Sequence, residues 1–190
     1  RSGLVPPTKL ISLDSIIQDH RLVKDKYEIA AIKKAAAASS DAHIGLMNYC
    51  SSASSERDIQ FFLSHRFNLL GGVEAYPSIV ASGRNACILH YTKNNSTLKD
   101  GDLLLVDAAC EIDNYTSDIT RTIPINGKFS EAQKDIYEIV LEAQLKAIDK
   151  CMPGKTLVDV HNEAVKWITK GLIRLNLIQT TLKYAIQNDL

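Results

Sequence analysis

The sequence predicts an α+β fold with a mainly antiparallel sheet, and three observations along the chain lead to this class. Residues 25–72 carry apolar side chains at helical spacing, residues 76–125 hold short segments rich in branched residues, and residues 130–175 return to helical spacing. Strands that follow one another without intervening helices pair most simply as antiparallel neighbours. Helices, then strands, then helices are therefore expected within the 190 residues.

Two helices are expected before the sheet. The first begins near Asp25, where isoleucines and alanines start to recur at helical spacing. The second follows a capping serine at positions 54–55 and ends at Gly71-Gly72, where a left-handed residue can close a helix. Ahead of both, the prolines at 6–7 end an extended opening segment.

Four segments between Tyr76 and Ile125 are expected to be strands: PSIVASG, ACILHY, DLLLVDAAC and YTSDITRTIPI. They are short and are separated by Gly, Asn or Asp. A capping box at Ser130–Gln133 then starts a helix that Pro153-Gly154 stops, and a further helix covers residues 158–175.

Composition and charge exclude several classes of protein. The 22 basic and 22 acidic residues give a formal net charge of zero, so no overall field favours nucleic acid or an anionic membrane surface. The four cysteines include no CxxC pair, which argues against a zinc ribbon or a dense disulfide scaffold and favours a reducing compartment. No run approaches the roughly 18 apolar residues that span a bilayer.

Two aspartates, Asp107 and Asp118, lie in the two arms of one expected hairpin. A loop centred on Ile112-Asp113 would place them directly opposite each other, with Cβ atoms about 4.5–5.5 Å apart on one face. A turn at Asp113-Asn114 has the better turn chemistry and would place Asp107 opposite Thr120, with Asp118 as a diagonal neighbour. In the first register, two like charges face each other and repel.

Several partners could relieve this repulsion. A divalent cation would hold both side chains as anions, because hard cations take carboxylate oxygens and two ions can share a carboxylate. A shared proton would instead leave one carboxyl neutral. Asp118 could also pair with Arg121, although alternation puts these two residues on opposite faces of a strand, and Asp107 could accept backbone amides at a strand end. The residues alone leave these alternatives open.

The segment LLVDAACEIDNYTSDITRTIPINGKFSEAQKDIYEIVLEAQ at 104–144 resembles the aminopeptidase P and prolidase family of metallopeptidases. ILHYTKNN at 88–95 and RLVKDKYEIAAIKKA at 21–35 share this likeness, which is greatest to mitochondrial aminopeptidases P, including the fungal intermediate-cleaving peptidase. The likeness covers nearly the whole chain. Its most specific part is the pattern Asp-x10-Asp-x-Thr-Arg-Thr with Leu-His-Tyr-x-x-Asn upstream.

The resemblance implies a pita-bread fold, in which helices back a curved antiparallel sheet, and two manganese or similar divalent ions held by two Asp, one His and two Glu. Asp107 and Asp118 match the two aspartates, and His90 matches a histidine near the substrate that is not a ligand. A histidine on a short strand is more often structural, so the role of His90 rests on the resemblance. Ala109 stands where the family usually has glycine, which an ordinary β backbone would tolerate.

The resemblance places the other three ligands beyond the region around Tyr184, so this chain is expected to carry two of five. His161 and Glu163 are not expected to replace them, because a spacing of two puts them on different faces of a helix. Residues 1–20 are expected to be a linker from a missing N-terminal domain, and residues 21–190 the N-terminal half of the catalytic domain. Alone, this piece is expected to be inactive and to bind metal poorly.

The whole protein is therefore expected to be a metal-dependent aminopeptidase that uses a metal-bridging hydroxide. Most members of the family cut before proline, whereas the intermediate-cleaving branch removes one bulky N-terminal residue from imported mitochondrial proteins, and no residue here decides between them. A mitochondrial location is expected, with the cytoplasm as the alternative, and a homodimer stays open. The rival interpretation is a non-catalytic pita-bread module that binds proteins, which the retention of Asp107, Asp118 and His90 disfavours.

Overall fold

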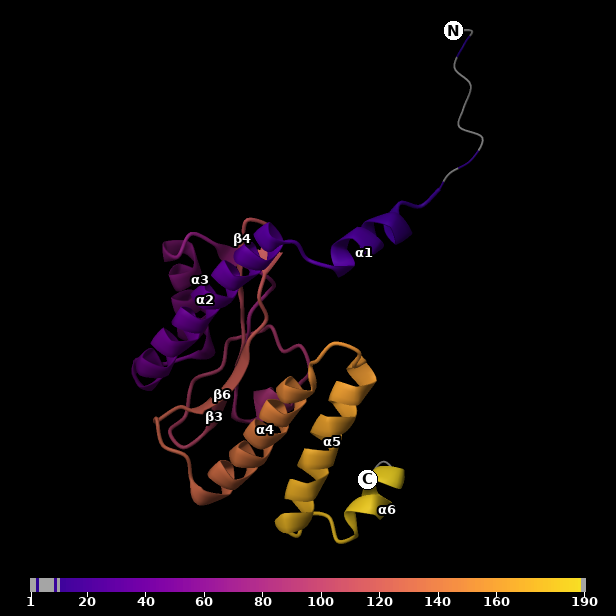
Figure 1. Ribbon diagram of the computed structural model, residues 1–190. Helices are drawn as coiled ribbons and strands as arrows, with labels where there is room; N and C mark the ends of the chain where they lie inside the picture. Colours follow the sequence, from indigo (N-terminus) through magenta and orange to yellow (C-terminus); the bar gives the residue numbers. More distant parts are fainter. Residues whose placement is uncertain (1–2, 4–8, 10, 189–190) are drawn as a thin grey trace. The chain divides into compact units, whose positions relative to one another are not determined.

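The computed structural model describes residues 3, 9 and 11–188, and it confirms the α+β class (Figure 1). The extended segment expected at residues 6–7 lies outside the described residues. The chain divides into two compact units, Arg1–Gly127 and Lys128–Leu190. Within the part of the chain that is described, no helix is both long and apolar enough to cross a membrane.

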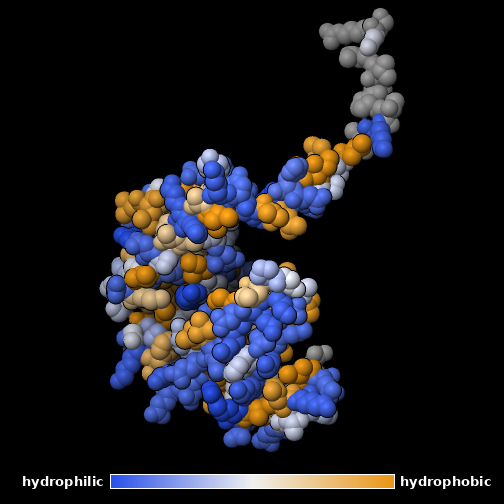
Figure 2. All heavy atoms as spheres, in the orientation of Figure 1, coloured by the Kyte–Doolittle hydropathy of each residue, from blue (hydrophilic) through white to orange (hydrophobic). Residues whose placement is uncertain are grey.

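Three α-helices open the first unit: α1 (Asp14–Leu22), α2 (Lys26–Tyr49) and α3 (Glu56–Leu69), with a short 3-10 helix η1 (Cys50–Ser52) before α3. Capping boxes start α2 and α3, with Asp25 and Ser55 as the N-caps. Gly71 follows α3 in a left-handed conformation at φ 83°, which confirms the predicted helix end. The helix α1 was not predicted; it leaves apolar side chains exposed, visible as orange patches in Figure 2.

Six strands form two three-stranded antiparallel sheets, in the orders β1-β4-β5 and β2-β3-β6. Their bounds are β1 (Val73–Glu74), β2 (Ile79–Ser82), β3 (Leu103–Asp107), β4 (Cys110–Ile112), β5 (Tyr115–Thr116) and β6 (Thr120–Pro124). The segment β3–β4 and the segment β5–β6 run antiparallel as the two arms of one long hairpin.

The tip of this hairpin is a two-residue turn at Asp113 and Asn114, with φ of 54° and 63°. Two successive positive φ angles define the turn type whose twist matches a β-hairpin. The pairing places Asp107 opposite Thr120. The register with a turn at Asp113-Asn114 is therefore confirmed, and the register that set Asp107 directly opposite Asp118 is wrong.

The segment ACILHY is not a strand, contrary to expectation. Residues Gly83–Cys87 form the 3-10 helix η2, and His90 lies in a turn with φ 54°. The physical reason is the buried carboxylate of Glu56, which accepts hydrogen bonds from Asn85 Nδ2 at 2.8 Å and Tyr91 Oη at 2.8 Å. These polar contacts curl the segment around a buried acceptor instead of extending it along a sheet.

The core of the first unit lies between the α2–α3 pair and the sheet (Figure 1). It contains small residues of α2, larger apolar residues of α3, and the inward-facing residues of the strands: Ala35, Ala38, Ala42, Leu46, Ile59, Leu63, Phe67, Val80, Leu104, Val106, Ala108, Cys110 and Ile112. Alanines on α2 allow the helix to approach the strands closely. This packing fixes which face of β3 is turned away from the core.

The second unit contains α4 (Glu131–Lys150), α5 (Leu157–Arg174) and α6 (Leu182–Gln187). Ser130 and Gln133 form the predicted capping box of α4, and Gly154 has φ 83° in the connection to α5. The helix α6 was not predicted. Gly171 of α5 lies against Ile139 of α4 so closely that an added Cβ would overlap the Ile139 side chain.

Gly72 shows a similarly close approach at the start of β1 and gives a test of the sheet. An added Cβ there would lie 2.5 Å from the Glu111 carbonyl oxygen and against the Cys110 sulfur. We expect Gly72→Ala to lower the free energy of unfolding by about 3 kcal/mol, as overpacking does. Gly71→Ala should cost less, about 1–2 kcal/mol, because only its left-handed backbone is strained. Urea unfolding measures both, and equal costs would contradict the close approach.

Candidate metal centre

Asp107 is the last residue of β3, on the face of the strand turned away from the core. Along this strand burial alternates, with Leu104 and Val106 buried and Asp107 half-buried. A strand places alternate side chains on opposite faces, so the apolar residues anchor the strand and the carboxylate emerges on the other side. The sequence LLLVD therefore holds an acid on a rigid, partly apolar surface.

The strand β3 ends at Asp107, and side chains of α2 bond the main chain between β3 and β4. His43 donates from Nε2 to the Ala108 carbonyl oxygen at 2.9 Å, and Cys110 N donates to Ser39 Oγ at 2.7 Å. Burial lowers the pKa of His43, so its ring is neutral with Nε2 protonated. These two contacts satisfy buried backbone groups and fix the main chain next to Asp107.

The segment that joins β1 to β2 runs beside this hairpin and forms a bulge next to Asp107. Ala75 N donates to Ala109 O at 2.8 Å, and Ile79 pairs with Asp107, so the segment Tyr76–Ser78 opposes Ala108 alone. A bulge of this kind bends a strand and redirects its side chains, often beside a functional site. Here it carries Tyr76 over the end of β3.

The hydroxyl of Tyr76 joins the two aspartates. It lies 2.6 Å from Asp107 Oδ1 and 3.1 Å from Asp118 Oδ1. Burial, followed by the two adjacent carboxylates, raises the pKa of Tyr76 well above its ordinary value, so the phenol stays protonated. One hydroxyl hydrogen serves two anionic oxygens, and the shorter contact is to Asp107.

The donor set fits a hard divalent cation in chemistry but not in number. Two carboxylates share one phenolic hydrogen, and no lysine or arginine pairs with either of them within the described residues. A cation would supply the missing positive charge, and carboxylate oxygen is the ligand that hard divalent ions prefer. Among the described residues no group of three or more His, Cys, Asp or Glu side chains could hold a metal ion. A metal site here would need further ligands beside Asp107 and Asp118.

His90 lies in the connection between η2 and β3. It is exposed in the turn after η2, and within the described residues no hydrogen bond or ion pair joins it to Asp107 or Asp118. Its neighbour Tyr91 is buried and bonded to Glu56, so the base of the turn is fixed while the histidine side chain is exposed to solvent. Its assignment near a substrate stays a prediction.

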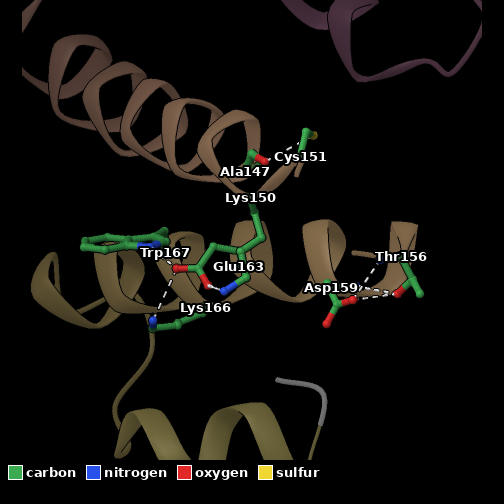
Figure 3. Close-up of polar contacts among 8 residues, drawn as sticks. All are labelled: Ala147, Lys150, Cys151, Thr156, Asp159, Glu163, Lys166 and Trp167. Carbon is green, nitrogen blue, oxygen red and sulfur yellow. Dashed lines mark hydrogen bonds and ion pairs between the residues drawn. The ribbon is translucent and has the colours of Figure 1, made fainter. Parts of the chain in front are cut away.

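His161 and Glu163 lie on α5 and do not form a ligand pair. Figure 3 shows Glu163 accepting from Trp167 Nε1 at 2.8 Å and pairing with Lys166 at 3.3 Å. Those bonds lower the pKa of Glu163, the bond from Trp167 being the larger cause. The Glu163 carboxylate is already bonded to Trp167 and Lys166 of the same helix. His161 is exposed.

Tyr76 is the functional candidate that the sequence pattern missed. It stands at the boundary of an expected strand, and nothing local marks a tyrosine as a partner of two distant aspartates. The one available signal is Pro77, which cannot donate to a ladder and so marks a bulge or strand end.

The chain is similar to known metallopeptidases. The model of metallopeptidase family M24 matches residues 30–185. The chain is 38% identical over 180 residues to a Xaa-Pro aminopeptidase of Escherichia coli, covering 94% of this chain and 41% of that protein. It is 39% identical over 183 residues to the Xaa-Pro aminopeptidase of Haemophilus influenzae, covering 96% and 43%.

Solved structures give the same result. The aminopeptidase PepP of Pseudomonas aeruginosa superposes with a TM-score of 0.92 at 45% identity, over 98% of this chain and 42% of that one. A zinc-substituted aminopeptidase P of E. coli, in complex with product, gives 0.93 at 37% identity, over 96% and 42%. The chain spans about two fifths of the length of the curated relatives it matches.

Proposed function

The chain belongs to metallopeptidase family M24, and we propose that the whole protein is a metal-dependent aminopeptidase that removes the N-terminal residue from peptides. The observation that carries this proposal is the meeting of Asp107 and Asp118 at one hydroxyl on a buried frame. Repelling acids kept together are of use to an enzyme that binds cations and of no use to a protein-binding module. Similarity to Xaa-Pro aminopeptidases favours substrates with proline in the second position.

Asp107 and Asp118 would hold two divalent ions, with manganese as the proposed metal, together with ligands from outside this chain. When bound, the ions supply Lewis-acid activation of water and of the peptide carbonyl. The strand end carrying Asp107 and the bulge beside it keep the carboxylates in place. His90, in its exposed turn, would donate a hydrogen bond to the carbonyl oxygen of the substrate.

The finer assignments are part of the same proposal. Residues 1–20 would link an N-terminal domain to residues 21–190, the N-terminal half of the catalytic domain. The proposed location is mitochondrial, with the cytoplasm as the alternative. The alternative specificity is the removal of one bulky N-terminal residue from imported mitochondrial proteins. The bacterial relatives above support the Xaa-Pro alternative instead.

Hydrolysis of paired peptides tests the function and its specificity together. We expect the full-length protein, stripped with a chelator, to be inactive, and manganese to restore cleavage of a peptide with proline at the second position. The same peptide with alanine at that position should be cut slowly, and the 190-residue chain alone should cut neither. Chromatography of the products measures this. No cleavage of either peptide at saturating manganese would favour the protein-binding module.

A further inference from the structure

The hydroxyl of Tyr76 lies between the carboxylates of Asp107 and Asp118 and contacts both. We propose that Tyr76 is the positioning residue of the metal centre, whose O–H fixes the Asp107 carboxylate and keeps Asp118 beside it. The inference rests on the proposed function, because it concerns how these carboxylates receive a cation. The phenol acts through its hydrogen bonds to the two aspartates and is not itself assigned as a ligand.

The backbone on both sides of Tyr76 is held independently of the two aspartates. Asn94 is buried; its Nδ2 donates to Ser78 O at 2.7 Å, and its Oδ1 accepts from Val80 N at 2.9 Å. On the other side, Ala75 N is bonded to the main chain of the hairpin. Pro77 restricts the backbone of the residue before it to extended conformations. Tyr76 is therefore fixed by its frame and can in turn fix a carboxylate.

The Tyr76 hydroxyl donates hydrogen bonds to both aspartates. Within the described residues, Tyr76 is the only side chain that donates a hydrogen bond to Asp107 or Asp118. Thr120, opposite Asp107 across the ladder, is exposed and makes no side-chain bond to it. Bonding one oxygen of Asp107 orients the carboxylate and leaves its other lone pairs for a cation. Partners of this kind orient metal ligands and tune their affinity.

Calorimetric titration of the full-length, chelator-stripped protein with manganese chloride tests the proposal. Tyr76→Phe keeps the ring and removes only the hydroxyl, and we expect its dissociation constant for manganese to rise roughly 10–100-fold. Tyr115→Phe is the matched control, because Tyr115 donates to the Glu28 carboxylate at 2.9 Å, away from the site. The control should bind manganese as the unaltered protein does.

Asp107→Asn separates the two levels of the hypothesis. If it abolishes manganese binding while Tyr76→Phe binds with unchanged affinity, the metal site stands and the positioning role is overturned. Tighter binding by Tyr76→Phe also overturns it, because the hydroxyl would then compete with the ion. If neither Asp107→Asn nor Tyr76→Phe changes binding, the metal site itself is wrong. A 10–100-fold loss shared by Tyr115→Phe would show a general effect of removing a phenol and overturn the specific role.

Discussion

Asp118→Ala in the full-length protein should reduce peptidase activity to less than about a hundredth, because loss of a residue that only supports a ligand already costs roughly 10–100-fold. The fold should survive this change. Asp118 is exposed and its one hydrogen bond within the described residues is the 3.1 Å contact to Tyr76. In the variant Tyr76 donates to Asp107 alone, and a repulsion is removed. We therefore expect the metal-free thermal midpoint to stay the same or rise while activity is lost.

Asp113→Asn is the control for this prediction. Asp113 is an exposed carboxylate in the turn of the same hairpin, and asparagine accepts its positive φ of 54°. The control removes an equal charge, and its surface pair with Lys34 at 3.4 Å contributes little. Peptide hydrolysis and thermal unfolding are measured on both variants. Activity near the unaltered level in Asp118→Ala would remove Asp118 from the metal site.

The hairpin shows what local chemistry can predict. Asp113-Asn114 is a strong turn signal, and the structure follows it. The hairpin has the register that this turn predicts, with Asp107 opposite Thr120, and not the register that sets Asp107 directly opposite Asp118. The aspartates still meet, through the hydroxyl of Tyr76 rather than across the ladder. Their proximity was predictable, whereas its geometry depended on a bulge in a third segment.

The remaining errors share one cause, which is a partner distant in sequence. ACILHY has the composition of a strand, but Asn85 and Tyr91 both donate hydrogen bonds to Glu56 of α3. These bonds hold the segment in a 3-10 helix and a turn. Tyr76 was missed because its partners lie in another hairpin. The helices α2, α3, α4 and α5 were predictable because their caps and apolar spacing are written locally. Local sequence patterns predict these helices and most strands. Hydrogen bonds to residues distant in sequence explain why ACILHY is not a strand and why Tyr76 was missed.

The buried carboxylate of Glu56 should contribute strongly to stability. Its side chain is fully buried and accepts five hydrogen bonds, from the N and Oγ of Ser82, Asn85 Nδ2, Tyr91 Oη and Ser96 N, at 2.8–2.9 Å. No lysine or arginine pairs with it among the described residues. Burial by itself would raise the pKa of Glu56, but the bonds from Asn85, Ser82, Ser96 and Tyr91 together lower it. The anion is therefore the form that these donors require.

Glu56→Gln should lower the free energy of unfolding by about 3 kcal/mol at pH 7, because an amide donor replaces an acceptor beside the Ser96 amide. A folded-state pKa below the ordinary value of 4.5 means that the Glu56 contribution is complete above that pH and is lost as the pH falls through the folded pKa. The difference between the two proteins should therefore shrink in acid.

Glu131→Gln is the matched control for this buried carboxylate, because Glu131 also follows a serine N-cap but is exposed at the start of α4. Both substitutions remove the same favourable charge from a helix N-terminus, worth about 0.3–1 kcal/mol. Any larger loss in Glu56→Gln therefore measures the buried network alone. Urea unfolding from pH 7 to well below pH 4.5 compares the two, and equal losses at pH 7 would show that the five bonds contribute nothing beyond the helix terminus. A larger loss for Glu56→Gln at pH 7 would show that the bonds to Glu56, two of which come from Asn85 and Tyr91 on either side of His90, stabilise the fold.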